Sequence, residues 1–105
     1  MMRITTWRAT GNAPQDNSPT AVIDAFNGAV AALKKVSGAG DVHWGFGNGG
    51  IVTVGFPSNY ATADAILKDS GVQAAVAKIF SLGINIAEDV FVADAQQVLP
   101  FVPAQ

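Results

Sequence analysis

His43 is the only histidine of the chain, and histidine is the side chain whose charge changes nearest to neutral pH. It would be the natural general base of an acid–base enzyme, with Asp41 two residues before it on the same side of an extended strand. The chain has no cysteine and no second histidine, so His43 has no evident partner for a catalytic triad or a metal site. We therefore expect no metal and favour the alternative, a strand residue at an interface. His43 is the catalytic candidate if the protein is an enzyme.

Five further residues could contact a substrate: Trp7, Arg8, Trp44, Phe46 and Tyr60. The aromatic side chains could line an apolar pocket for an aromatic molecule, although such residues more often form the ordinary core of a small domain. A buried indole N–H needs an acceptor, so the two tryptophans mark places where polar groups or a ligand can lie. Arg8 could pair with a substrate carboxylate, whereas an exposed strand arginine is the more common case.

Residues 45–52, with the sequence GFGNGGIV, match the pattern GxGxxGxV of the phosphate-binding loop of protein kinases. No other kinase segment accompanies this match, and no lysine follows it before Lys68. A dinucleotide-binding loop would lead into a helix, whereas this loop leads into an apolar strand. Asn48 and Gly49 between two alternating segments are instead typical of a β-hairpin turn.

The register of this hairpin decides which side chains share a face. A two-residue turn would pair Phe46 with Ile51 and leave both faces of mixed polarity. A three-residue loop with a glycine bulge would pair Phe46 with Val52 and produce one wholly apolar face. The second register is predicted. It places His43 on the opposite, partly hollow face, which suits a cavity or a close partner.

The composition favours one small globular domain covering residues 1–105. The chain is 50% hydrophobic and 13% charged, which is enough for one core and too little for two domains. Its net charge is −2 and its six basic residues are scattered, so no nucleic-acid partner is expected. The lack of cysteine and of any run of about 20 apolar residues predicts a cytoplasmic protein without a membrane partner.

Strands are expected where β-branched and aromatic residues gather, over residues 3–10, 42–56 (as the hairpin) and 88–95. A polar loop over residues 11–18 leads into the first helix. Ser18 is the expected N-cap and Pro19 the first helical residue.

The first helix is expected to end near residues 37–38, and a second helical region to begin after Ser58 or Asn59. That region should be interrupted at residues 70–71. An apolar tail with two prolines covers residues 98–103, where proline prevents a helix or a central strand.

The predicted order is β-α-β-β-α-β, whose usual solution is the ferredoxin-like α+β fold, a four-stranded antiparallel sheet with both helices on one face. With this order, the aromatic hairpin of residues 42–56 and the apolar last strand, nearly the whole chain resembles the dimeric α+β barrel superfamily. That superfamily includes antibiotic-biosynthesis-type monooxygenases, stress-responsive barrel proteins and small polyketide cyclases. The resemblance implies a homodimer in which the bare sheet faces close into a barrel, with a pocket between sheet and helices in each subunit.

The leading functional hypothesis is a homodimeric barrel that binds a hydrophobic or aromatic small molecule. Its chemistry, if any, would be that of a monooxygenase, cyclase or isomerase of secondary metabolism, and no cofactor is expected. One alternative is a non-catalytic dimer that binds ligands or joins partners. Another is a haem-binding barrel with His43 as the axial ligand. An enzyme should place His43 or Arg8 in a pocket that opens to solvent, whereas a structural dimer should fill that space with side chains.

Overall fold

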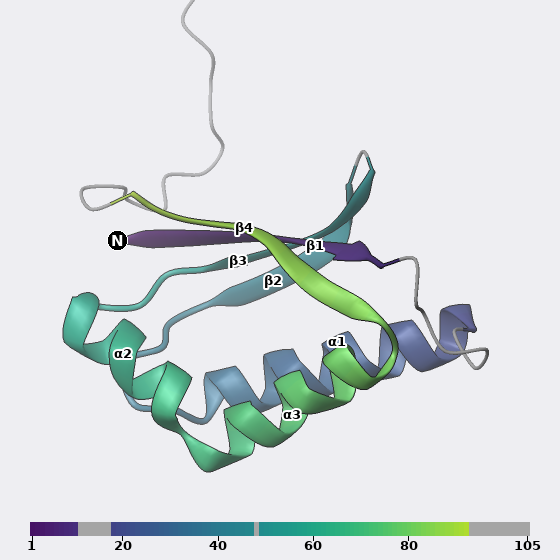
Figure 1. Cartoon of the computed structure of the whole chain (residues 1–105). Coiled ribbons are helices and arrows are strands. Elements are labelled where there is room, and N and C mark those ends of the chain that lie inside the picture. Colours follow the sequence, from purple (N-terminus) through teal and green to yellow (C-terminus); the bar gives the residue numbers. More distant parts are fainter. Residues whose placement is uncertain (11–17, 48, 93–105) are drawn as a thin grey trace, which may run out of the picture.

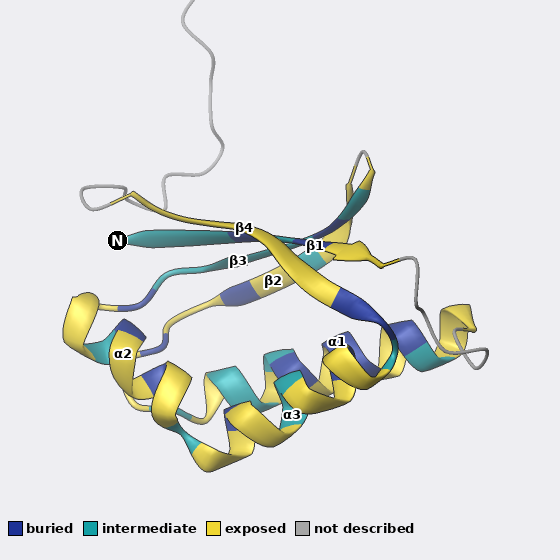
Figure 2. Cartoon of the chain, in the orientation of Figure 1, coloured by how far each residue is buried: buried dark blue, intermediate teal, exposed yellow. Residues whose placement is uncertain are grey.

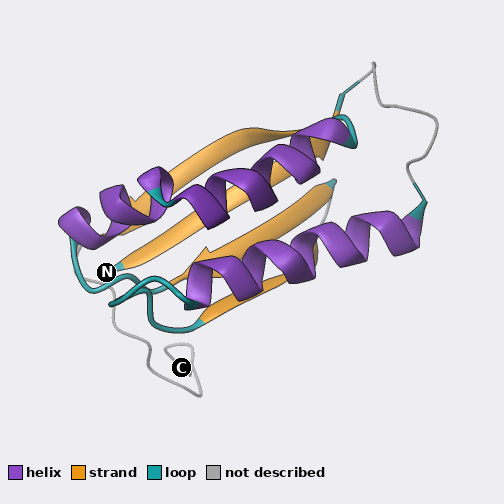
Figure 3. Cartoon of the chain, turned by 90° about the horizontal axis from the view of Figure 1, so that it is seen from below, coloured by secondary structure: helices purple, strands orange, loops and turns teal. Residues whose placement is uncertain are grey.

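A computed structural model describes residues 1–10, 18–47 and 49–92 of the chain. Its antiparallel sheet has the strand order β2-β3-β1-β4, and the helices lie against one side of it (Figure 1; Figure 3). The elements are β1 (Met2–Ala9), α1 (Pro19–Lys34), β2 (Val42–Gly47), β3 (Gly50–Gly55), α2 (Tyr60–Lys68), α3 (Ser70–Ser81) and β4 (Ile84–Val92). The predicted ferredoxin-like α+β architecture is confirmed.

The helices begin where the capping residues predict. The Ser18 hydroxyl accepts a hydrogen bond from the backbone N–H of Ala21 at 3.2 Å, and Pro19 follows as the first helical residue. The Asn59 side chain accepts from the N–H of Thr62 at 2.8 Å and starts α2. Helix α1 ends at Lys34, a few residues before the predicted end.

Asp69 divides the second helical region into α2 and α3. Its extended backbone (φ −65°, ψ 129°) ends α2, and its carboxylate accepts from the N–H of Val72 at 2.9 Å to begin α3. The predicted interruption at residues 70–71 is therefore present, one residue earlier in the chain. The resulting bend sets α2 at an angle to α3 (Figure 1).

The outer strands differ from their predicted bounds. Strand β1 lies one residue earlier than predicted, and β4 begins at Ile84 rather than at Glu88. Gly83, with a positive φ of 76°, turns the chain from α3 into this strand, so only Leu82 and Gly83 separate the two elements. The polar loop over residues 11–17, the end of the predicted last strand and the apolar tail lie outside the described residues.

The predicted hairpin register is wrong. Phe46 lies opposite Ile51, not Val52, so the turn is the two-residue one. Strand β1 accounts for the difference, because Trp7 lies opposite Ile51 and its indole N–H donates to the Thr53 hydroxyl at 3.0 Å. In the sequence, the polar Thr53 on an otherwise apolar face argues against this register. In the structure, its hydroxyl has a hydrogen-bond partner in Trp7, so the polar group is tolerated there.

The core fills the space between the sheet and helices α1 and α3 (Figure 2). Phe26 and Ile79 are fully buried at its centre. The Phe26 ring packs edge-on against Trp7, with centroids 5.5 Å apart, and stacks against Trp44 at 5.4 Å. Both tryptophans therefore pack in the core, which is the more common role of such residues in a small domain.

Helices cover only one of the two faces of the described sheet (Figure 1). Side chains alternate along a strand, so the partners of the buried Thr5 and Trp7 face the helices, while the partners of Ile4 and Thr6 face away. One cross-strand row of this uncovered face consists of His43, Val54, Ile4 and Val90.

Candidate functional site

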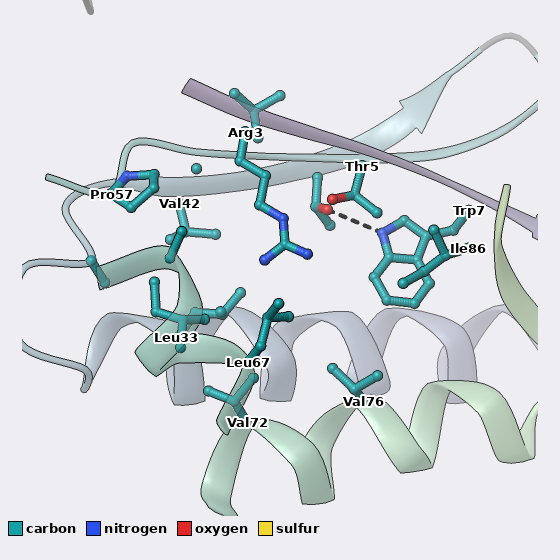
Figure 4. A pocket seen from close by; sticks show the side chains of 16 residues that line it. Arg3, Thr5, Trp7, Leu33, Val42, Pro57, Leu67, Val72, Val76 and Ile86 are labelled. Atoms are coloured by element: carbon teal, nitrogen blue, oxygen red, sulfur yellow. Dashed lines mark hydrogen bonds between the residues drawn. The ribbon is translucent and has the colours of Figure 1, made fainter. Parts of the chain in front are cut away.

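A cavity of about 110 Å³ lies between the helix-facing side of the sheet and the helices (Figure 4). Its lower walls are apolar and come from all three helices. They are formed by Leu33, Ala63, Ile66, Leu67, Val72 and Val76. The upper side is formed by the strands, where Arg3, Thr5, Trp7 and Thr53 bring polar atoms to the cavity.

Two hydrogen bonds order the threonines of this upper side. The Trp7 indole N–H donates to the Thr53 hydroxyl at 3.0 Å. The Thr5 hydroxyl donates to the Asp89 carboxylate at 2.8 Å, and Thr5 is only 4% exposed. Since Thr53, Thr5 and Asp89 lie opposite one another on β3, β1 and β4, they form one polar cross-strand row above the cavity.

Arg3 is the charged group at the cavity. Its Nε and Nη2 atoms donate to the two oxygens of Asp89 at 3.0 and 2.8 Å, a two-pronged ion pair. The guanidinium carbon lies 5.2 Å from the centre of the Phe91 ring, within the range of a cation–π contact. The Arg3 side chain is 16% exposed and that of Asp89 is 28% exposed. In Figure 4 the Arg3 side chain descends from β1 toward the apolar walls.

Asp89 stays ionised in this setting. Burial opposes its charge, but the hydrogen bonds from Arg3 and Thr5, together with the positive charge of Arg3, outweigh burial and lower the pKa of Asp89 below its ordinary value. The ion pair is therefore present at neutral pH. Charge-assisted bonds of this geometry hold the guanidinium in one orientation.

A β-bulge turns Asp89 toward the helices. Thr6 lies opposite Glu88 and Trp7 lies opposite Ile86, so Ala87 is an extra residue in β4. If Ala87 were paired normally and the alternation ran unbroken from Ile86, Glu88 would face the helices and Asp89 would face away. The extra residue reverses the alternation, and Asp89 faces the helices instead.

Of the predicted substrate-binding residues, Trp7 lines the cavity, and the other four do not. Trp44 packs on Phe26, and its indole N–H donates to Asn27 at 2.9 Å. Arg8 is exposed near the end of β1. Phe46 and Tyr60 are 67% and 59% exposed.

His43 is exposed on the uncovered face of the sheet, opposite Val54, and does not line the cavity. Val42 and Trp44 on either side of it point to the helices, so the pleat directs His43 away from them. Its catalytic role remains a prediction.

Two residues of the site, Arg3 and Asp89, were not among the predicted ligand contacts. The alternation around Thr5 could have indicated Arg3, which precedes it by two residues on one face of β1. No local signal indicates the bulge that turns Asp89.

Within the described ranges, no three histidine, aspartate or glutamate side chains gather as metal ligands would. In the same part of the chain, no helix is both long enough and apolar enough to cross a membrane.

The chain matches no protein-family model and no curated protein by sequence. Its structure is similar to solved ones. SnoaB from Streptomyces nogalater, described as a cofactor-independent oxygenase, superimposes with a TM-score of 0.69 at 12% identity, over 95% of this chain and 96% of SnoaB. A candidate antibiotic biosynthesis monooxygenase from Deinococcus radiodurans has a TM-score of 0.64 at 12% identity, with 93% and 97% covered.

A third structure is a dimeric ferredoxin-like protein of unknown function from Jannaschia sp. CCS1. It has a TM-score of 0.65 at 12% identity, with 88% of this chain and all 100% of that chain covered. The superposition thus runs over almost the full length of each protein. The chain has the ferredoxin-like fold of these structures.

Proposed function

We propose that the chain is a homodimeric protein that binds a small, mostly apolar molecule in the cavity beneath its sheet. The observation that carries this proposal is the cavity itself, with apolar walls from three helices and a few polar groups along one side. Small-molecule sites have this composition, in which apolar walls supply contact area and a few polar groups set the orientation.

The size of the cavity supports a ligand with a single ring. An apolar cavity of about 150 Å³ engineered in another protein binds benzene. The present cavity of about 110 Å³ is of the same order. Modest movement of Leu67, which is 48% exposed at the edge of the cavity, would enlarge it.

The uncovered face of the sheet supports the homodimer. Ile4, Val54 and Val90 form an aliphatic row there, and Val90 and Val92 remain 40% and 38% exposed in the monomer. Continuous apolar surface of this kind marks a contact with another molecule. Two of the similar structures, from Jannaschia sp. CCS1 and Bacteroides fragilis, are described as dimeric, and a second copy of this chain is the occupant we propose.

Filling the cavity tests the proposed binding. Gly55 lines it, and a Cβ at this position would meet Val42 only at 3.9 Å, an ordinary contact distance. We expect Gly55→Leu to fold and to block ligands. Ethylbenzene at 100 times its Kd should stabilise the wild type by about 2.7 kcal/mol, which raises the melting temperature by roughly 10 °C or more.

Gly28→Leu is the matched control, because Gly28 lies on the exposed side of α1 with no atom within 4 Å of an added Cβ. It should respond to ethylbenzene as the wild type does. Equal responses from both variants would show that ethylbenzene binds elsewhere, and no response from the wild type to ethylbenzene, benzene or indole would reject the binding function.

Catalysis in the same cavity is a second candidate, favoured by the likeness to the oxygenase SnoaB over 95% of this chain. Such a reaction would use molecular oxygen as the oxidant and the bound aromatic molecule as the electron donor. An oxygen electrode with a panel of single-ring phenols tests it. Uptake that Gly55→Leu abolishes would support an oxygenase, and binding without uptake would leave a binding protein. His43 lies on the other face of the sheet, so a folded and dimeric His43→Ala variant should keep any oxygen uptake that occurs in the cavity, and loss of uptake would instead support a general base on the uncovered face.

A further inference from the structure

We propose that Arg3 selects the ligand by donating a hydrogen bond to a neutral carbonyl oxygen, so that the cavity takes single-ring aromatic ketones and aldehydes in preference to hydrocarbons or carboxylates. This inference rests on the proposed binding function, and it names the class of molecule that would occupy the site.

Arg3, the charged residue that lines the cavity, offers a free donor. Arg3 uses Nε and Nη2 for Asp89, and within the described part of the chain its Nη1 makes no hydrogen bond. Thr53 accepts from the Trp7 indole, which leaves its own hydroxyl proton to donate. Both oxygens of Asp89 already accept, one from Arg3 and Thr5 and the other from Arg3. A ligand that complements the free Nη1 of Arg3 must bring an acceptor, and the threonine hydroxyls can adjust to such a ligand because a hydroxyl both donates and accepts.

The charge balance favours a neutral acceptor. Arg3 and Asp89 form a closely spaced pair with no net charge, and the walls around them are apolar. A carboxylate in the cavity would lose its hydration and would stand near the negative charge of Asp89. A ketone oxygen loses little hydration and can still accept a strong hydrogen bond from a cationic donor.

Asp89 and Phe91 act as positioning residues. The two-pronged contact with Asp89 fixes the plane of the guanidinium, and the Phe91 ring lies 5.2 Å from its central carbon. The donor that remains is therefore oriented before the ligand arrives. Preorganisation of this kind raises affinity, because little side-chain freedom is lost on binding.

The test compares three probes of similar shape, ethylbenzene, acetophenone and benzoate, by titration calorimetry on the full-length protein. We expect acetophenone to bind about tenfold or more tightly than ethylbenzene, and benzoate to bind more weakly than acetophenone. In Arg3→Met, which keeps an unbranched apolar stem but removes the guanidinium and its donors, the preference for acetophenone should fall to about twofold or less. Affinity for ethylbenzene should persist.

Arg8→Met is the matched control, since Arg8 lies on the same strand, is exposed and does not line the cavity. It should keep the wild-type preference. If Arg3→Met fails to fold because Asp89 loses its partner, the double variant Arg3→Met with Asp89→Asn removes both charges and serves in its place.

The outcomes separate the two proposals. If none of the three probes binds to the wild type, the binding function itself fails. If ethylbenzene and acetophenone bind equally, or if Arg3→Met keeps the preference, the cavity binds ligands but Arg3 does not select them. Tightest binding of benzoate would overturn the assignment to neutral carbonyl compounds.

Discussion

The two faces of the sheet use the same four strands for different purposes. The helix-facing side combines apolar residues with a polar row of Thr53, Thr5 and Asp89, and each of these side chains makes a hydrogen bond. The uncovered side presents Ile4, Val54 and Val90 in one row, with no hydrogen bond between side chains of the described residues there.

This difference fits the two proposed roles, ligand binding on the helix-facing side and dimer formation on the uncovered side. Buried polar groups require partners in defined directions, which suits a site that must orient a ligand. Aliphatic side chains on a sheet require only close contact, which suits an interface between identical subunits. Substitutions on one face should therefore change ligand binding and monomer stability, and substitutions on the other should change the oligomeric state.

The largest effect should come from a charge on the uncovered face. Ile4→Lys would place an ammonium group in the proposed dimer interface without a partner, at a cost of about 3–5 kcal/mol. The dissociation constant of the dimer should rise at least about hundredfold. Light scattering should then give a mass near 10.8 kDa for the variant and twice that for the wild type.

Ile23→Lys controls for the added charge, because Ile23 is already 37% exposed on α1. Its mass should equal that of the wild type. A wild-type protein that is monomeric at micromolar concentration would refute the proposed dimer outright.

The threonines of β1 and β3 allow the same substitution on both faces. Thr53→Val removes the acceptor of the Trp7 indole N–H, and Trp7 is only 6% exposed. The free energy of unfolding, measured with urea, should therefore fall by about 1–3 kcal/mol. Thr6→Val on the uncovered face breaks no side-chain hydrogen bond of the described residues and should be neutral or slightly stabilising. Equal losses from both variants would remove the distinction between the faces.

The smallest effect concerns pH. In the folded state burial raises the pKa of Asp89, but the hydrogen bonds from Arg3 and Thr5 and the charge of Arg3 lower it by more. The pKa therefore lies below its ordinary value, and folding favours the ionised form. This contribution to stability is present above about pH 4 and is lost as the pH falls below that value. We expect the free energy of unfolding, measured with urea from about pH 6 down to about pH 2, to fall less for Asp89→Asn than for the wild type. This range is chosen because ordinary carboxyl groups titrate within it.

Asp24→Asn, on the exposed side of α1, removes the same charge and controls for net charge. If the free energy of unfolding fell equally with pH for the wild type and Asp89→Asn, the ion pair with Arg3 would contribute nothing to stability.

Much of the fold follows from local signals. Ser18 with Pro19, and Asn59, identify helix starts because capping and proline act within one turn of the chain. The glycine-rich turn identifies the hairpin for the same reason. The hairpin register does not follow, because it depends on the bond between Trp7 and Thr53, two residues brought together only by the sheet.

The site is less predictable for a related reason. Trp7 could be found because a tryptophan indicates both burial and a need for an acceptor. Arg3 and Asp89 are far apart in the sequence and meet only when β1 pairs with β4. Exposed aromatic residues such as Phe46 and Tyr60 carry the same sequence signal as Trp7, although they lie outside the cavity.

The bulge at Ala87 sets the course of β4 and not only the direction of its side chains. Deletion of Ala87 would leave Ile86 opposite Trp7 and Asp89 opposite Thr5, so the same side chains would face the helices. The deletion would instead remove the local bend and the added twist that a bulge gives a strand. The roof of the cavity would flatten while its polar row stayed the same, so the length of this edge strand controls the shape of the site separately from its chemistry.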